Sequence, residues 1–109
     1  MTTAVIHLRD IEQYATAIAQ ILRPRRIVLF GSHAYGKPTR ESDVDLLVEM
    51  DEVADPVTAA LRVRRAVAAP FPVDLLVRSS QDIQRRIELG DYFVQDIVAR
   101  GKELYASAD

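Results

Sequence analysis

Two aspartates at the start of an apolar stretch have a spacing that indicates chemistry. Asp43 and Asp45 stand two residues apart in DVDLLVEM, residues 43–50, which the alternation of residue types predicts as a strand. Residues two apart on a strand lie on one face, with about 6–7 Å between their Cα atoms. Like charges held there repel, and burial makes the repulsion worse. Two interpretations stay open: a cation between the carboxylates, or a strand end that faces solvent.

A third aspartate lies in a repeat of the same five residues. Asp74 belongs to VDLLV at 73–77, and VDLLV also stands at 44–48. If the two strands are neighbours, Asp74 joins Asp43 and Asp45. Three carboxylates can hold two metal ions roughly 3.5–4 Å apart, as in in-line displacement at phosphorus. Because Mg²⁺ prefers carboxylate oxygens and keeps positions open for phosphate, the three aspartates are predicted to bind metal and to act in catalysis.

A glycine–serine pair precedes the aspartates by ten residues. Gly31 and Ser32 lie between an apolar run at 26–30 and a short helix expected at 33–36, with Ser32 as its N-cap. Free backbone N–H groups and the helix dipole favour phosphate at such a place. Glycine lets a phosphate approach the backbone, and the serine hydroxyl adds a donor. Gly31 and Ser32 are therefore predicted to bind phosphate groups.

These residues together resemble the signature of a known superfamily. Gly31-Ser32, then Gly36, then residues 42–45 (SDVD) resemble the motif of the DNA-polymerase-beta-like nucleotidyltransferases. The resemblance continues through the Asp74 strand to IVARGKELYA at 97–106. Within the superfamily, the short chain is similar to the minimal nucleotidyltransferases of the MntA type, which are often encoded beside a helical HEPN-domain protein.

The resemblance implies a metal-dependent enzyme with ATP as substrate and two Mg²⁺ ions, or Mn²⁺, as cofactors. The β- and γ-phosphates would lie over Gly31 and Ser32. Asp43 and Asp45 would hold the ion that bridges these phosphates, all three aspartates would hold the second ion, and Asp74 would orient the acceptor hydroxyl.

The resemblance also implies a partner. AMP would be transferred to a tyrosine hydroxyl of a HEPN-family toxin, and this chain would be the antitoxin of a type VII toxin–antitoxin pair. Two alternatives stay open: a non-catalytic antitoxin that neutralises its partner by binding, and nucleotidyl transfer to RNA or to a small molecule.

The chain departs from the family pattern at two positions. Where many members have arginines, it has His33 and Tyr35. Lys37 and Arg40 could supply positive charge there, or could be solvated loop charges. His33 is expected to be a partly exposed helix residue.

Composition limits the class of protein. The chain has 109 residues, of which 49% are hydrophobic, so one domain over 1–109 with a real core is expected. The net charge of −2 does not indicate a nucleic-acid partner. The chain has no cysteine for a disulfide or a thiolate metal site. With no apolar run near ~20 residues and no signal-peptide pattern, no membrane association and a cytoplasmic location are expected.

Strand and helix patterns alternate along the sequence. Helices are predicted at 10–23, with Asp10 as cap and Gln13 closing a capping box, and at 33–36, 56–68, 80–89 and 91–100. Strands are predicted at 26–30, 43–50, 73–78 and 103–106. This order favours an α/β (α+β) fold of the nucleotidyltransferase type, a small mixed β-sheet flanked by helices.

Other polar and aromatic residues carry weaker signals. The basic clusters at 23–26, 62–65 and 84–86 are expected to face solvent, with an acidic partner or RNA as the alternative. Tyr14 fits the apolar stripe of the first helix. Tyr92 and Tyr105 are expected to be packing residues.

Overall fold

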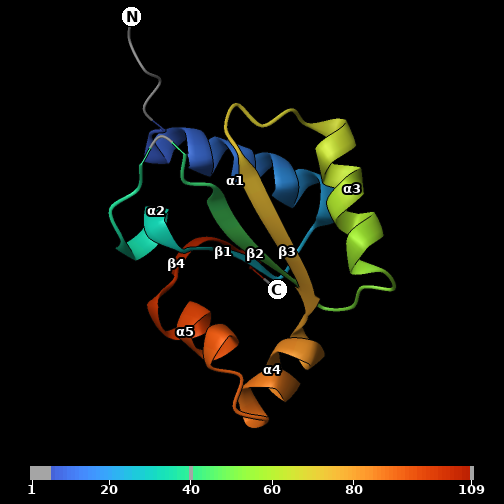
Figure 1. Ribbon diagram of the computed structural model, residues 1–109. Coiled ribbons are helices and arrows are strands. Elements are labelled where there is room, and N and C mark those ends of the chain that lie inside the picture. Colours follow the sequence, from blue (N-terminus) through green and yellow to red (C-terminus); the bar gives the residue numbers. More distant parts are fainter. Residues whose placement is uncertain (1–5, 40, 109) are drawn as a thin grey trace, which may run out of the picture.

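The computed structural model describes residues 6–39 and 41–108. Five helices and four strands follow one another in this part of the chain: α1 (Leu8–Leu22), β1 (Arg26–Phe30), α2 (Ser32–Tyr35), β2 (Val44–Met50), α3 (Pro56–Ala66), β3 (Val73–Ser79), α4 (Ser80–Glu88), α5 (Tyr92–Arg100) and β4 (Lys102–Ala106). The strands form one sheet in the order β3-β2-β1-β4 (Figure 1). β2 and β3 are parallel, and β1 is antiparallel to both of its neighbours. The predicted α/β class with a mixed sheet is confirmed.

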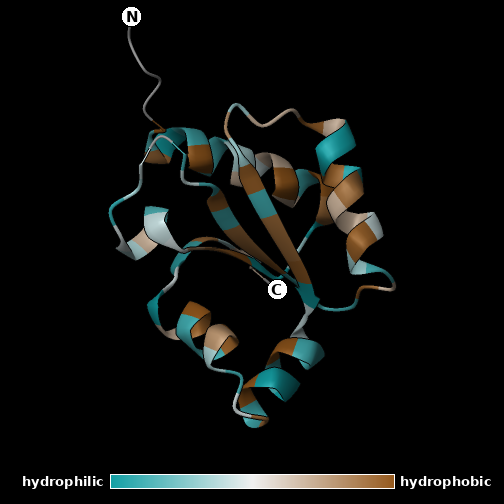
Figure 2. Cartoon of the chain, viewed as in Figure 1, coloured by the Kyte–Doolittle hydropathy of each residue, from teal (hydrophilic) through white to brown (hydrophobic). Residues whose placement is uncertain are grey.

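Helices cover both faces of the sheet. α1 and α3 pack on one face, and α4 and α5 on the other (Figure 1). The first core includes Ile11, Ile18, Leu46 and Val63. The second includes Val28, Leu47, Ile83 and Ile97. Figure 2 shows mainly hydrophobic strands, with hydrophilic residues interrupting β2 and β3 near the ends at which these strands begin.

Register brings three chain segments to one end of the sheet. β1 ends at Phe30, which pairs with Asp45 near the start of β2. Asp45 in turn pairs with Asp74 near the start of β3. Because paired residues share a face, a row Phe30–Asp45–Asp74 crosses the sheet on the side of α4 and α5. β3 is the edge strand, so Asp74 lies at an open edge.

A nearly buried ion pair fixes the opposite end. Glu49 is 8% exposed. Its carboxylate accepts hydrogen bonds from the Nε of Arg26 at 2.6 Å and from the hydroxyl of Ser80 at 2.7 Å. These bonds join β1, β2 and the first residue of α4.

Several predicted boundaries are wrong by one or two residues. α1 begins at Leu8 with His7 as its N-cap, and Asp10 accepts a hydrogen bond from the backbone N–H of His7 at 3.4 Å. The predicted cap and capping box at Asp10 and Gln13 are therefore incorrect, because the helix begins two residues earlier than predicted and Asp10 lies within its first turn. α2 covers Ser32–Tyr35 rather than 33–36, and its N-cap is Gly31 rather than the predicted Ser32.

The remaining differences lie in the later elements. α3 ends at Ala66 rather than residue 68, and β4 begins at Lys102 rather than 103. The end of α1, the end of β3, the end of α4 and the start of α5 each differ from the prediction by one residue. No helix in the described part of the chain is long and apolar enough to cross a membrane.

Candidate active site

Asp45 and Asp74 lie side by side on two parallel strands. Their Cα positions are register partners, so both side chains belong to the face that α4 and α5 cover. Asp43 immediately precedes β2, and the strand that was predicted to begin at residue 43 begins at Val44. Asp45 is partly buried, whereas Asp43 and Asp74 are exposed. The fold therefore brings the three predicted aspartates to one end of the sheet, with Asp45 between the other two.

The three carboxylates act on one another electrostatically. Burial raises the pKa of Asp45 above its ordinary value, and the negative charges of Asp74 and Asp43 raise it further. His33 acts in the opposite direction and lowers it. A cation at this place would remove the repulsion and favour the ionised form of Asp45.

Gly31 brings the backbone into contact with Asp45. Its φ of 75° lies in the left-handed region, which favours glycine. A Cβ at this position would overlap the Oδ2 atom of Asp45. No other residue type fits here without a shift of the carboxylate or of the backbone. Ser32 and His33 are the first residues of α2, so their backbone N–H groups have no acceptor within the helix.

His33 connects α2 to the loop before the aspartates. Its Nε2 lies 3.2 Å from the carbonyl oxygen of Ser42, a hydrogen bond that needs the proton on Nε2. Ser42 directly precedes Asp43, so this bond links the two halves of the site. His33 is partly exposed, as predicted.

Tyr35 connects α2 to α5. Its hydroxyl donates to Asp96 at 3.4 Å, and the guanidinium of Arg100 lies 4.0 Å from the centre of its ring. Arg100 also contacts Asp96 at 3.3 Å. Asp96 and Arg100 were not predicted. Their i, i+4 spacing indicates a helical ion pair, but nothing in the sequence indicates a contact with a residue 61 positions away.

Of the two cations that the sequence offered in place of the family's arginines, Lys37 is exposed in the loop after α2. Arg40 lies outside the described residues.

The donor set fits a hard divalent cation. Within residues 6–39 and 41–108, no three His, Cys, Asp or Glu side chains are gathered as a ready metal site. Asp43, Asp45 and Asp74 nevertheless offer only carboxylate oxygens, which Mg²⁺ and Mn²⁺ accept.

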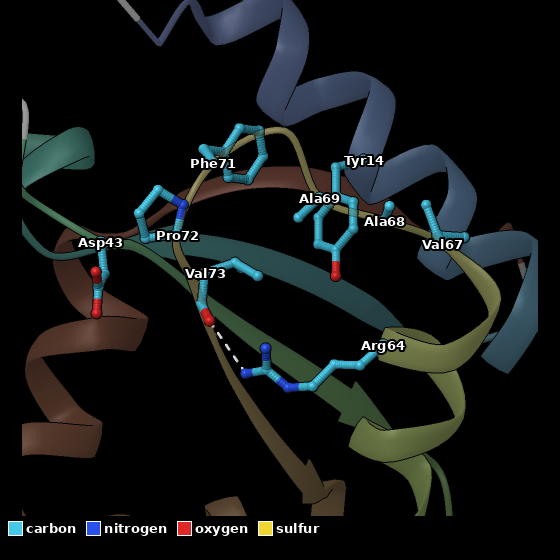
Figure 3. A pocket seen from close by; sticks show the side chains of 9 residues that line it. All are labelled: Tyr14, Asp43, Arg64, Val67, Ala68, Ala69, Phe71, Pro72 and Val73. Atoms are coloured by element: carbon cyan, nitrogen blue, oxygen red, sulfur yellow. Dashed lines mark hydrogen bonds between the residues drawn. The ribbon is translucent and has the colours of Figure 1, made fainter.

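A cavity of about 390 Å³ lies beside Asp43, toward α1 and α3 (Figure 3). Its other lining residues are Tyr14, Arg64, Val67, Ala68, Ala69, Phe71, Pro72 and Val73. Tyr14 is 4% exposed, which confirms its predicted place in the apolar stripe of α1. Its ring packs edge-on against Phe71. The cavity was not predicted, because residues from three separate segments of the chain line it.

Comparisons with known proteins agree with this fold. The nucleotidyltransferase domain family matches residues 11–104. A protein of Methanocaldococcus jannaschii named "putative protein adenylyltransferase" is 31% identical over 103 residues, which cover 89% of this chain and 96% of that protein. A solved Sulfolobus solfataricus structure described as a "putative nucleotidyltransferase" has a TM-score of 0.56 at 21% identity and covers 72% of this chain and 71% of its own.

Two toxin–antitoxin structures are also similar. A variant of the MntA-HpeT toxin–antitoxin, in which two aspartates two positions apart are replaced by glutamate, has a TM-score of 0.56 at 23% identity. A toxin–antitoxin with AMP-PNP has a TM-score of 0.55 at 24% identity. Each match covers 89% of this chain and 74% of the other. At these identities the likeness concerns the fold.

Proposed function

This chain belongs to the nucleotidyltransferase domain family, and we propose that it transfers AMP from ATP to a hydroxyl group of a protein. One observation carries the proposal: Asp45 and Asp74 pair in register, with Asp43 close enough for its charge to raise the pKa of Asp45. Clustered carboxylates beside a backbone that can take phosphate are what a metal-dependent phosphoryl-transfer site needs.

Each side chain has a role in this proposal. The backbone N–H groups at Ser32 and His33 and the hydroxyl of Ser32 hold the β- and γ-phosphates, and Gly31 lets them approach. Asp43 and Asp45 would hold one Mg²⁺ ion, and all three aspartates would hold a second. Bound there, Mg²⁺ or Mn²⁺ neutralises charge on the phosphates and on the leaving pyrophosphate.

Asp74 serves the acceptor. It orients the hydroxyl and accepts its proton as the oxygen attacks the α-phosphorus. The new bond joins that oxygen to phosphorus, and the bond to pyrophosphate breaks. The catalytic gain comes from positioning and charge neutralisation. Two hydrogen bonds hold α2, and with it Gly31 and Ser32, against the aspartates. One joins His33 to the carbonyl oxygen of Ser42, and the other joins the Tyr35 hydroxyl to Asp96.

A protein is the best-supported acceptor. The Methanocaldococcus jannaschii relative is named "putative protein adenylyltransferase", and this chain covers 96% of it. The similar toxin–antitoxin structures support a toxin as partner. We therefore propose a tyrosine of a HEPN-family toxin as the acceptor and an antitoxin role for this chain.

The position of the phosphate label in ATP distinguishes this reaction from its alternatives. The chain is incubated with Mg²⁺, with a HEPN-family protein encoded beside it, and with ATP labelled at either the α- or the γ-phosphate. Label from the α-phosphate should appear on the partner, and label from the γ-phosphate should not. Asp74→Asn should abolish transfer while sparing ATP binding more than Asp43→Asn does.

A second experiment distinguishes catalysis from neutralisation of the partner by binding alone. The Asp43→Asn, Asp45→Asn double variant should transfer no label and should not protect cells from the partner. If the double variant protects as well as the wild type, and no labelled protein ever appears, binding alone neutralises the toxin and the enzymatic proposal is rejected.

A further inference from the structure

A phenylalanine near the start of α5 borders the row of residues that contains two of the aspartates. The ring of Phe93 packs edge-on against the ring of Phe30, with 5.7 Å between the ring centres. Phe30 is the register partner of Asp45, and adjacent strands lie about 4.8 Å apart. Phe93 therefore lies one strand spacing and one ring contact away from Asp45, on the sheet face that also carries Asp74.

The contacts of α5 place this ring on the side of the helix that faces α2. Phe93, Asp96 and Arg100 follow one another at i, i+3 and i+7, so they lie on one stripe of the helix. Asp96 and Arg100 both contact Tyr35 of α2. Because α2 begins directly after Gly31, the stripe that carries Phe93 faces the end of β1, where the phosphates are proposed to bind.

More than half of Phe93 is left open by the fold. The residue is 58% exposed, whereas its helix neighbours Val94 and Ile97 are 5% and 1% exposed. The buried pair anchors α5 on the sheet, so this packing does not depend on Phe93. An aromatic ring that is held at one side by another ring and open at the other is a platform on which a flat ligand can stack.

The proposed transfer requires a place for the base of the nucleotide. In the proposed function, on which this inference rests, the pyrophosphate lies beside Gly31 and the acceptor hydroxyl beside Asp74. In-line displacement puts these two groups on opposite sides of the α-phosphorus, along the row Phe30–Asp45–Asp74. The nucleoside is attached to the same phosphorus and has to leave this axis. Because the aspartate side chains stand between the phosphorus and the sheet, the nucleoside extends away from the sheet, along the side of α5.

We propose that the adenine base of the bound ATP stacks on the exposed face of Phe93. Stacking of a base on an aromatic side chain needs no specific hydrogen bond, so a single well-placed ring is enough. Phe30 holds the ring of Phe93 in its orientation. The hydrogen bond between Tyr35 and Asp96 holds α5 at a fixed distance from the phosphate-binding residues. Phe93 is thus a nucleotide-binding residue that lies far along the chain from the motif at residues 31–45.

A neighbouring aromatic residue offers a matched control position. Tyr92 is 84% exposed, and among the described residues its ring packs against no other aromatic ring. Successive residues of a helix point about 100° apart, so Tyr92 points to a different side of α5 from Phe93. A probe at Tyr92 therefore has the same exposure to solvent as one at Phe93, or more, without the proposed contact with the base.

Tryptophan fluorescence measures stacking at this ring directly. The chain has no tryptophan, so Phe93→Trp introduces a single indole, whose emission is quenched when a base stacks on it. Emission is recorded while Mg²⁺–ATP is added. The control ligand is Mg²⁺–tripolyphosphate, which has the phosphates but no base. The control protein is Tyr92→Trp, which carries the same indole one residue away.

Mg²⁺–ATP should quench the emission of the Phe93→Trp chain. Mg²⁺–tripolyphosphate should leave this emission unchanged and should weaken the effect of ATP, because it competes for the phosphate-binding residues. The emission of the Tyr92→Trp chain should change with neither ligand. Absence of quenching by saturating Mg²⁺–ATP, or equal quenching at the two positions, overturns the proposal.

Removing the ring provides a second measurement. Phe93→Leu keeps an apolar contact with Phe30 but has no aromatic face, so it should bind Mg²⁺–ATP at least about fivefold more weakly than the wild type, as measured by isothermal titration calorimetry. Both chains should bind Mg²⁺–tripolyphosphate equally. Equal affinities for ATP would overturn the proposal. So would an equal loss of affinity for tripolyphosphate, because the ring would then support the fold and not the base.

A catalytic variant separates this inference from the proposed function. Asp74→Asn combined with Phe93→Trp should show the same quenching at saturating Mg²⁺–ATP, because stacking needs no transfer. Quenching at position 93 combined with a failed transfer assay would reject the proposed function alone. Successful transfer that Phe93→Leu performs with an unchanged KM for ATP would reject the stacking position alone.

Discussion

Asp45 and Asp74 are register partners on two parallel strands, and the charge of Asp74, added to burial, raises the pKa of Asp45. The pair therefore costs the fold stability at neutral pH when no cation is bound. Carboxyl groups whose pKa values are shifted by burial together with a neighbouring charge are frequent at functional sites.

Replacing Asp45 by asparagine should raise the thermal stability of the metal-free chain at neutral pH. A carboxyl whose pKa is raised on folding stabilises the fold below its unfolded value, near 3.8, and this contribution is lost as the pH rises through the folded pKa. An asparagine side chain cannot ionise, so the variant escapes that loss. The difference in Tm between variant and wild type should grow between about pH 3 and pH 7. If the variant is less stable than the wild type at every pH, the ionised Asp45 carboxylate does not destabilise the fold.

Metal and nucleotide together should stabilise the wild-type chain. Mg²⁺–ATP at 100 times its Kd should add about 2.7 kcal/mol to the free energy of unfolding. Asp43→Asn should lose most of this gain, because Asp43 and Asp45 are proposed to hold a metal ion that binds together with the nucleotide. Thermal melts with Mg²⁺ alone, ATP alone and both together provide the measurement. An unchanged Tm at saturating Mg²⁺–ATP would show that the aspartates do not form this site.

Comparing Gly31 with Gly90 measures how closely the backbone at Gly31 packs against the Asp45 carboxylate. Both have a left-handed φ, 75° and 84°, but a Cβ at Gly90 would meet nothing within 4 Å, whereas at Gly31 it would meet the Asp45 carboxylate. Gly90→Ala should therefore cost only the backbone strain, about 1–2 kcal/mol. Gly31→Ala should cost more and should also abolish nucleotide binding.

A second variant shows whether the extra cost comes from the carboxylate. In an Asp45→Ala background, Gly31→Ala should cost no more than Gly90→Ala does, as measured by urea denaturation. Equal costs for the two glycines in the wild-type background would show that Gly31 is not packed against Asp45.

Tyr14→Phe should stabilise the free chain by about 1 kcal/mol, because it removes a buried hydroxyl without a partner and keeps the ring contact with Phe71. Tyr35→Phe is the matched control, since the Tyr35 hydroxyl donates to Asp96 and its loss should not stabilise. Urea denaturation of both variants gives the comparison. If Tyr14→Phe destabilises, a partner such as ordered water satisfies the hydroxyl.

The local parts of the site could be predicted from sequence because each depends on a short stretch. The alternation in residues 43–50 and the repeat at 73–77 indicate strands, and the fold pairs them in the register that puts Asp45 beside Asp74. From the sequence alone it could be said only that Asp74 joins the other aspartates if the two strands are neighbours. Which strands become neighbours depends on how the whole sheet packs against the helices, and no local pattern of residues determines this packing.

Contacts between distant segments could not be predicted for the same reason. Arg100 over the Tyr35 ring and the Tyr14 hydroxyl in its cavity depend on how α5 and α1 pack. Tyr92 shows the limit most clearly: an aromatic residue in an amphipathic helix was expected to pack, yet it is 84% exposed. It begins α5, before the turn at which Val94 and Ile97 reach the core.

Intact-protein mass spectrometry of the partner tests the central claim most directly. A HEPN-family protein encoded beside this chain is incubated with it, Mg²⁺ and ATP, and fragmentation then locates any added group. The account predicts a mass increase of one or more AMP units on a tyrosine hydroxyl, absent when Asp43 and Asp45 are both replaced by asparagine and absent when the modified tyrosine is replaced by phenylalanine. A partner whose mass never changes, although it binds the chain and is neutralised by it, would contradict the account.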